Sequence, residues 1–199
     1  MGTNILEKLN GIEVAQDIIR SRKAKTLQVQ GARRAGVLLI IYGRRNKKIL
    51  FIKRSTKVRY HQGEISLPGG AFDSRDSTLV DTAIRETSEE IGLSIEPSAI
   101  WGQLDDVPTH VSNFVITPFV THLDRLPPLR VNLDETVDVI GTPLRALLGV
   151  HPRRPAGSQG LRKEAGFFRV GQDIVWGATG SIVKQFLDII TPNGQLDGG

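Results

Sequence analysis

The chain has 199 residues, 39% of them hydrophobic and 24% charged, with a formal net charge of +5. This composition is ordinary for a folded protein and excludes wholesale disorder, and the absence of cysteine excludes disulfides, thiolate zinc sites and cysteine nucleophiles. No apolar run approaches the roughly 18–20 residues that span a bilayer, and the first twenty residues lack a signal-peptide pattern, so we expect a cytoplasmic location and no membrane partner.

The positive charge suits an anionic partner such as a phosphorylated metabolite. Nucleic acid is disfavoured, because only two Trp, two Tyr and seven Phe accompany the basic residues, too few for a base-stacking platform.

The chain ahead of the first strand is predicted to be a helical, basic extension over residues 1–30, with one domain over residues 31–199. A rough apolar stripe precedes a basic stretch at residues 20–25, and its members are Ile12, Ala15, Ile18 and Ile19. Apolar positions of this extension are candidates for a homodimer interface.

Two strands and a tight turn follow. A continuous apolar run at residues 35–42 has the pattern of a buried strand, and a second strand is expected at residues 49–53 after a polar turn. Together they predict a β-hairpin. A segment rich in turn-forming residues then leads to Leu67-Pro68-Gly69-Gly70.

The clearest helix is predicted over residues 78–91. It stops at Gly92, a residue favoured just after a helix, and Asp76 or Ser77 is expected to cap its N-terminus. Four positions at helical spacing predict a stripe that faces the core: Val80, Ile84, Thr87 and Ile91.

Further strands are expected at residues 100–104 and 113–121, and a short helix at residues 143–148, with Thr142 as N-cap and Pro143 at its first position. Residues 151–165 are predicted to form a long loop. A closing helix is predicted over residues 181–190, with five residues directed inward: Ile182, Val183, Phe186, Leu187 and Ile190. Strands mixed with a few helices predict a single α/β (α+β) domain.

Three glutamates of the predicted helix share one face: Glu86, Glu89 and Glu90. They repel one another and lie near the helix C-terminus, where the helix dipole disfavours anions. A sequence selected only for stability would place lysine there. Hard oxygen ligands on one face suit Mg²⁺ or Mn²⁺, although such a cluster taken alone is more often a solvated acidic face.

The surroundings of the cluster favour a site. Arg85 precedes it and is expected to pair with one of three aspartates: Asp81, Asp76 or Asp73. Gly69-Gly70 permits close backbone approach and positive φ, and Pro68 stiffens the turn. Together, strand, turn, loop and acidic helix suggest a cradle for a metal-bound pyrophosphate.

Residues 70–93 resemble the Nudix box, G-x5-E-x7-R-E-U-x-E-E-x-G-U, where U is aliphatic. The second half matches at Arg85, Glu86, Glu89, Glu90 and Gly92, with Thr87 at the first aliphatic position. The first half departs from the pattern, because one extra residue separates Gly70 from Arg85 and the first glutamate is missing. Asp76 falls at that glutamate's site.

The longer spacing resembles the coenzyme A pyrophosphatase branch of the Nudix family, which also carries an upstream motif, L-L-T-x-R-S-x3-R-x3-G-x3-F-P-G-G. The residues in register with it are Arg54-Ser55, Arg59, Gly63 and Pro68-Gly69-Gly70. Leu67 replaces the phenylalanine, and Phe51-Ile52 replaces Leu-Thr. Weaker similarity continues at residues 115–118 and 174–179.

The resemblance implies a Nudix α/β/α sandwich around a mixed sheet. It implies Glu86 and Glu90 as ligands of Mg²⁺ or Mn²⁺, with Glu89 as a ligand of a second metal ion or the activator of water, beside Arg85. Four residues are candidates for substrate binding, the arginines because guanidinium pairs bidentately with phosphate: Arg54, Arg59, Gly69 and Gly70. The general base is left open among three residues: Glu89, Glu64 and Glu135.

The implied reaction is attack of water on phosphorus, which would split coenzyme A into 3′,5′-ADP and 4′-phosphopantetheine. The same chemistry on ADP-ribose, a dinucleotide or an oxidised nucleotide is a second hypothesis, and a non-catalytic Nudix-fold binding or regulatory module is a third. The four histidines lack metal-binding spacing and are expected to be surface or structural residues: His61, His110, His122 and His151.

Overall fold

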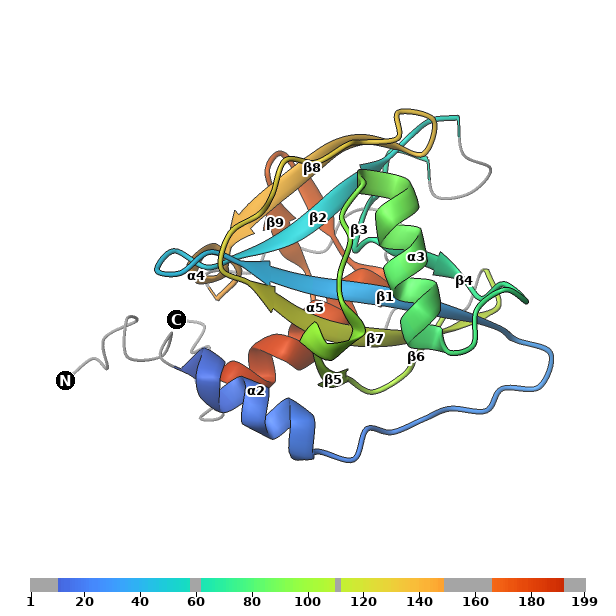
Figure 1. Ribbon diagram of the computed structural model, residues 1–199, viewed down its shortest axis with the longest axis horizontal. Coiled ribbons are helices and arrows are strands. Elements are labelled where there is room, and N and C mark those ends of the chain that lie inside the picture. Colours follow the sequence, from blue (N-terminus) through green and yellow to red (C-terminus); the bar gives the residue numbers. More distant parts are fainter. Residues whose placement is uncertain (1–10, 58–61, 110–111, 149–165, 192–199) are drawn as a thin grey trace.

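The computed structural model describes residues 11–57, 62–109, 112–148 and 166–191, in which helices cover both faces of a mixed β-sheet (Figure 1). One face carries α3 (Leu79–Ile91), and the other carries α2 (Gly11–Ser21) and α5 (Gly177–Ile190). This arrangement confirms the predicted α/β sandwich. None of the helices in these stretches has the length and apolar character needed to cross a membrane.

The sheet is centred on β1 (Arg33–Tyr42), which pairs antiparallel with β2 (Lys48–Arg54) and parallel with β7 (Phe114–Leu123). β1 and β2 form the predicted hairpin, and β8 (Thr136–Pro143) pairs along the other edge of β2. Shorter strands complete the sheet: β3 (Ile65–Ser66), β4 (Gly69–Ala71), β5 (Ile100–Gln103) and β6 (Val107–Pro108). Outside it, β9 (Phe168–Val170) and β10 (Asp173–Val175) form an antiparallel pair.

The continuous apolar runs of β1 and β2 fill two cores, because successive strand side chains point to opposite faces. Four alternate residues lie beneath α3: Leu38, Ile40, Leu50 and Ile52. The intervening four lie on the side of α2 and α5: Leu39, Ile41, Ile49 and Phe51. The sheet is therefore buried on both faces, which holds β1 and β2 rigidly below the helix that carries the glutamates.

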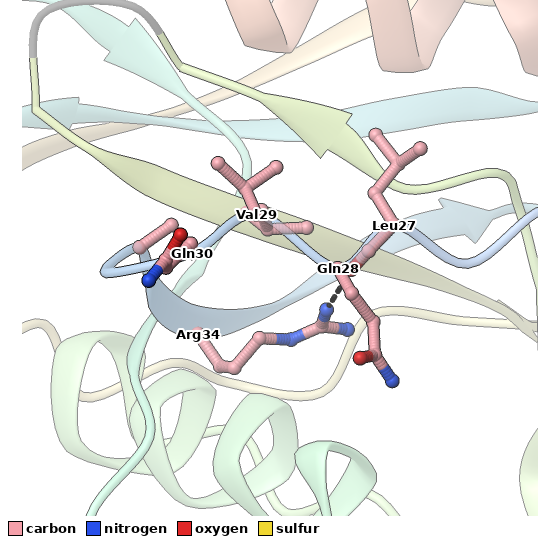
Figure 2. Close-up of a pocket in the computed structure, with 7 residues that line it drawn as sticks. Leu27, Gln28, Val29, Gln30 and Arg34 are labelled. Atoms are coloured by element: carbon pink, nitrogen blue, oxygen red, sulfur yellow. Dashed lines mark hydrogen bonds between the residues drawn. The ribbon is translucent and has the colours of Figure 1, made fainter.

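The segment that joins α2 to β1 is held against the sheet by Asp106, whose side chain is fully buried. Asp106 accepts hydrogen bonds from the backbone N–H of Leu27, from Arg34 and from Thr117. Arg34 also donates to the Leu27 carbonyl at 2.7 Å, and Figure 2 shows this contact in the shallow groove beside residues 27–30. Arg34 and Asp106 thus fasten the segment that lines this groove to the sheet.

Helix α2 packs against α5 and β5, and three residues of its predicted stripe are buried: Ile12, Ala15 and Ile19. Ile18, the fourth member of the apolar stripe, is exposed at 36%. Ile12, Ala15 and Ile19 follow the i, i+3, i+7 spacing of one helical face, from which Ile18 is turned away by about 100°.

Helix α3 begins after Thr78, so the predicted caps, Asp76 and Ser77, are wrong. Thr78 and Asp81 form a reciprocal capping box, because each side chain accepts a hydrogen bond from the other residue's backbone N–H. At the other end, Gly92 ends the helix in the left-handed conformation with φ 67°, as predicted. In the predicted stripe, Thr87 and Ile91 are buried, and the other two members, Val80 and Ile84, are only partly buried.

The buried face of α3 differs from the predicted stripe because the helix lies very close to β1. A Cβ at Gly36 of β1 would overlap the Leu79 carbonyl, so only glycine allows this approach. Ala83, fully buried, takes the central position of the interface. Small residues on both elements therefore set the distance between helix and sheet.

Near the C-terminus, α4 spans Leu144–Leu147, so the predicted cap at Thr142 and first helical residue at Pro143 are wrong. Both residues belong to the end of β8, which pairs as far as Pro143 opposite Lys48. Helix α5 begins at Gly177, earlier than predicted, and its five inward residues are all buried, as predicted. The loop predicted at residues 151–165 lies outside the described residues.

Candidate active site

The C-terminal half of α3 lies against β4, and two glycines of that strand make the contact (Figure 1). Gly70 pairs with Gly36 of β1, and a Cβ at Gly70 would overlap the Glu86 carboxylate. Gly69 has φ 138°, and a Cβ there would overlap the backbone of β1. Gly69 and Gly70 were expected in a turn and instead belong to β4, whose pairing with β1 brings bare backbone against the glutamates of the helix.

Glu90 is the most deeply buried of these glutamates, with 2% of its surface exposed. Its Oε2 accepts a hydrogen bond from the Gly69 N–H at 2.9 Å, and its Oε1 lies 3.6 Å from Nη1 of Arg54. Burial raises the pKa of Glu90 to about 8, even though both of these contacts favour the charged form. The fold therefore holds a carboxylate where its ionisation is costly.

Glu86 and Glu89 are both paired with Arg85, whose Nη1 lies 2.9 Å from each carboxylate. Burial also raises the pKa of Glu86, against the effect of Arg85. The side chain of Glu89 is 45% exposed. The three predicted carboxylates are therefore not equivalent: Glu86 and Glu90 lie against β4, and Glu89 lies at the surface.

Arg85 pairs with Asp76, one of its three predicted partners. Its Nε and Nη2 donate to the two oxygens of Asp76 at 2.8 and 3.0 Å. Thr82 adds a hydrogen bond to the same carboxylate at 2.8 Å, and the Arg85 guanidinium holds the pKa of Asp76 well below its usual range. The other two aspartates are engaged locally, Asp81 in the capping box and Asp73 with Arg75.

These contacts fasten the loop after β4 to the middle of α3. The role of Thr82 was not predicted, because a threonine within a helical pattern gives no sign of a partner in another segment. Asp76 stands at the position of the missing glutamate of the Nudix box. Its carboxylate accepts hydrogen bonds from Arg85 and Thr82.

A loop ahead of β8 closes the other side of the site. Asn132 donates its backbone N–H to the Glu90 carbonyl at 2.9 Å and its side-chain amide to Glu135 at 3.3 Å. Glu135 in turn accepts, through its carbonyl, the backbone N–H of Ser55 at 2.8 Å. Its negative charge contributes to the raised pKa of both Glu86 and Glu90. The candidate base Glu135 is thereby placed beside the carboxylates of α3.

Of the other predicted residues, Glu64 lies at the approach to β3, where its carbonyl accepts the Arg54 N–H at 3.0 Å. Arg59 lies outside the described residues. His122 lies in β7, where its Nε2 is 3.2 Å from the Gly43 carbonyl and its ring contacts Trp101, in agreement with a structural role. The three remaining histidines are outside the described part of the chain.

Within the described residues, no three His, Asp or Glu side chains converge as a ready set of metal ligands. Arg85 holds Glu86 and Glu89 in this arrangement. The donor chemistry nevertheless fits a hard divalent cation, because Glu86 and Glu90 are desolvated carboxylates whose pKa is raised, a cost that a cation would relieve. Gly70 also leaves the Glu86 carboxylate free of any neighbouring Cβ.

The structure has a mixed sheet between helices, and its acidic helix packs on a strand that contains Gly69-Gly70. This arrangement is the one that the resemblance to the Nudix family implies. The NUDIX domain profile matches residues 32–141, more than half of the chain, and the chain belongs to the Nudix hydrolase family. Members of this family generally need divalent metal ions.

Curated relatives agree with this family. The chain is 30% identical to the uncharacterized Nudix hydrolase NudL of Photorhabdus laumondii, over 77% of this chain and 82% of the relative. It is 31% identical to Nudix hydrolase 3 of Caenorhabditis elegans, over 73% of this chain and 68% of the relative.

Solved structures share the fold at lower sequence identity. A MutT/nudix family protein from Enterococcus faecalis superposes with a TM-score of 0.57 at 14% identity, covering 96% of this chain and 76% of that one. The MutT protein of Methanosarcina mazei gives a TM-score of 0.51 at 17% identity, covering 88% and 99%. At such identities the likeness concerns the fold alone.

Proposed function

We propose that the protein is a Mg²⁺- or Mn²⁺-dependent hydrolase that cuts the pyrophosphate of a nucleoside diphosphate derivative, with coenzyme A as the favoured substrate. The products would be 3′,5′-ADP and 4′-phosphopantetheine. One observation carries the chemistry: Glu90 is almost fully buried, held by the Gly69 N–H and placed near a second desolvated carboxylate, Glu86. Such a pair costs stability and is explained by a cation that it binds.

The residues divide into three roles. Glu86 and Glu90 would hold the metal, and Glu89 is a candidate ligand for a second ion. When bound, a divalent metal neutralises the pyrophosphate, lowers the pKa of its bound water and stabilises the leaving phosphate. Arg85 fixes the helix glutamates against the loop through Asp76.

On the substrate side, Arg54 lies beside Glu90 with a quarter of its side chain exposed, a position that suits a phosphate clamp. Arg59 is proposed for the same task, and Gly69 and Gly70 stay proposed for substrate binding beside the carboxylates of Glu90 and Glu86. For the general base, Glu135 and Glu89 are the candidates near enough to influence Glu86, and Glu64 remains a third.

The choice of coenzyme A rests on two sequence features. Arg54-Ser55, Arg59 and Gly63 match the upstream motif of the coenzyme A pyrophosphatase branch, and the spacing between Gly70 and Arg85 is one residue longer than in the Nudix box. Hydrolysis of ADP-ribose, a dinucleotide or an oxidised nucleotide would use the same carboxylates. A binding module without turnover is the alternative of another class, and the intact network around Arg85 argues against it.

A panel of pyrophosphate substrates with Mg²⁺ or Mn²⁺, read by mass spectrometry, tests the proposal. We expect 4′-phosphopantetheine from coenzyme A, abolished in Glu90→Gln and retained in Glu96→Gln, a matched change at an exposed glutamate outside the site. Faster turnover of ADP-ribose would transfer the assignment to the second substrate class. Absence of turnover across the panel, with Mg²⁺ still bound, would establish the binding module instead.

A further inference from the structure

Three buried side-chain polar atoms among the described residues have no hydrogen-bond partner: Arg54 Nε, Ser66 Oγ and Thr136 Oγ1. Buried polar atoms are hydrogen-bonded in the large majority of cases, so each exception calls for an explanation. All three lie on neighbouring strands, β2, β3 and β8. Two of them, on Arg54 and Thr136, belong to residues that are paired across β2 and β8.

The strand register places these three atoms on the α3 side of the sheet. Ile52 belongs to the core beneath α3, and Arg54, two residues further along β2, reaches Glu90 on the same side. Thr136 is the cross-strand partner of Arg54, which puts their Cβ atoms about 5 Å apart on that face. Ser66 pairs with Ile52 and lies diagonal to Arg54, within reach of a long side chain.

A bulge in β8 produces this arrangement. Lys53 pairs with Asp138 and Arg54 with Thr136, so Val137 is the extra residue between them. Val137 is 49% exposed, whereas Thr136 is fully buried. Bulges redirect side chains next to functional sites, and this one places Thr136 on the same face of the sheet as Arg54.

Arg54 also needs an anchor other than Glu90. The distance of 3.6 Å from its Nη1 to Glu90 Oε1 is longer than a hydrogen bond, so this ion pair alone does not fix the guanidinium. An anchor at Nε would fix the plane of the group and leave both Nη nitrogens free for Glu90 and for a phosphate.

We propose that Thr136 is a positioning residue whose hydroxyl binds a buried water molecule that also accepts a hydrogen bond from Arg54 Nε. Water fits because both atoms are polar and closed off from solvent, and two polar contacts are the minimum that a buried water makes. The functional part of this inference rests on the proposed function, since it assumes that Arg54 and Glu90 act in the active site.

Three variants test the proposal. Thr136→Val keeps the shape and removes the hydroxyl, Thr136→Ser keeps the hydroxyl, and Thr121→Val is the matched control. Thr121 is equally buried in the same sheet, but its hydroxyl already donates to the Ala99 carbonyl at 2.9 Å. We expect Thr136→Val to lower kcat about tenfold or more, as the loss of supporting hydrogen bonds around active-site groups does, with rescue in Thr136→Ser and no change in Thr121→Val.

A crystal structure supplies a readout that does not depend on turnover. The wild-type protein should show an ordered water within hydrogen-bond distance of Thr136 Oγ1 and Arg54 Nε, and Thr136→Val should lose it and displace the guanidinium. Wild-type density without that water would overturn the proposal, as would a Thr136→Val protein that melts higher and keeps full kcat. If no substrate is turned over, the proposed function fails, and the crystallographic result still decides the position of Arg54.

Discussion

Asp76 accepts two hydrogen bonds from Arg85, at 2.8 and 3.0 Å, and this pair joins the loop after β4 to the middle of α3. Both side chains are largely removed from solvent, with 3% and 19% exposed. Neither β4 nor α3 supplies this connection by its backbone alone. The pair therefore contributes both to the stability of the loop and to the position of Arg85, which contacts Glu86 and Glu89 of α3.

Replacing Asp76 with Asn should leave the Arg85 charge without its main partner. Arg85 keeps its contacts with Glu86 and Glu89, so the loss is that of charge-assisted hydrogen bonds, and we expect the free energy of unfolding, measured by urea titration, to fall by about 1.5–3 kcal/mol. Asp73→Asn is the control, because Asp73 pairs with the exposed Arg75 nearby in the loop and its loss should leave the free energy of unfolding nearly unchanged. Equal losses in the two variants would contradict this role for Asp76.

Glu90→Gln should stabilise the metal-free protein at alkaline pH. The pKa of Glu90 is about 8 in the folded protein against 4.5 for a free side chain, so the folded state binds the proton more tightly. The resulting stability is complete below pH 4.5, is lost as the pH rises towards 8, and is replaced above 8 by the cost of a buried charge. Glutamine stays neutral and still accepts the Gly69 N–H.

The melting temperature of Glu90→Gln, measured with chelator present, should therefore exceed that of the wild type at pH 9 by several degrees, since each kcal/mol shifts it by about 2–4 °C in a protein of this size. The difference should shrink at pH 5. A variant that melts lower than the wild type at pH 9 would show that the Glu90 charge stabilises the fold.

Addition of metal should reverse the order of the melting temperatures of the wild type and Glu90→Gln. A ligand that binds only the folded state raises its stability in proportion to the logarithm of its concentration above Kd. Mg²⁺ or Mn²⁺ should thus raise the melting temperature of the wild type and have little effect on Glu90→Gln, as read by calorimetric scans with and without chelator. An equal rise in both proteins would place the metal away from Glu90.

Gly70→Ala should impair the site more than the fold. The new methyl group would overlap the Glu86 carboxylate, a flexible side chain that can swing away, whereas the backbone of β4 can remain paired with β1. We expect at least a tenfold loss of metal affinity or activity, by analogy with other disturbed ligand shells, with a small change in unfolding free energy. Titration calorimetry with Mn²⁺ alongside urea unfolding separates these two quantities, and unchanged Mn²⁺ affinity would argue against Glu86 as a ligand.

The parts of the site that were predictable are those defined by neighbouring residues. Helical spacing located α3 and its glutamates, and Gly92 marked the end of the helix. The cap was mispredicted because Asp76, a good capping residue, is occupied by Arg85, and Thr78 caps in its place. A tertiary contact thus determined which residue, Asp76 or Thr78, caps the helix.

The contributions from distant strands were beyond local patterns. Glu135 reaches the site only because β8 pairs with β2, and the burial of Thr136 depends on a bulge at Val137 that no turn residue announces. Likewise, the apolar stripe of α2 did not show which of its members pack against α5 and β5, and Ile18 is exposed. Register and packing partners decide such positions, and both require the assembled sheet.

The anchoring of the N-terminal segment by Asp106 has a practical consequence for work with this enzyme. A shortened protein starting at residue 32, where the family match begins, would lack the Leu27 backbone contact to Asp106 and would uncover the core surface that Ile12, Ala15 and Ile19 protect. We expect such a fragment to aggregate on expression. We therefore expect a stably folded fragment of this protein to need helix α2.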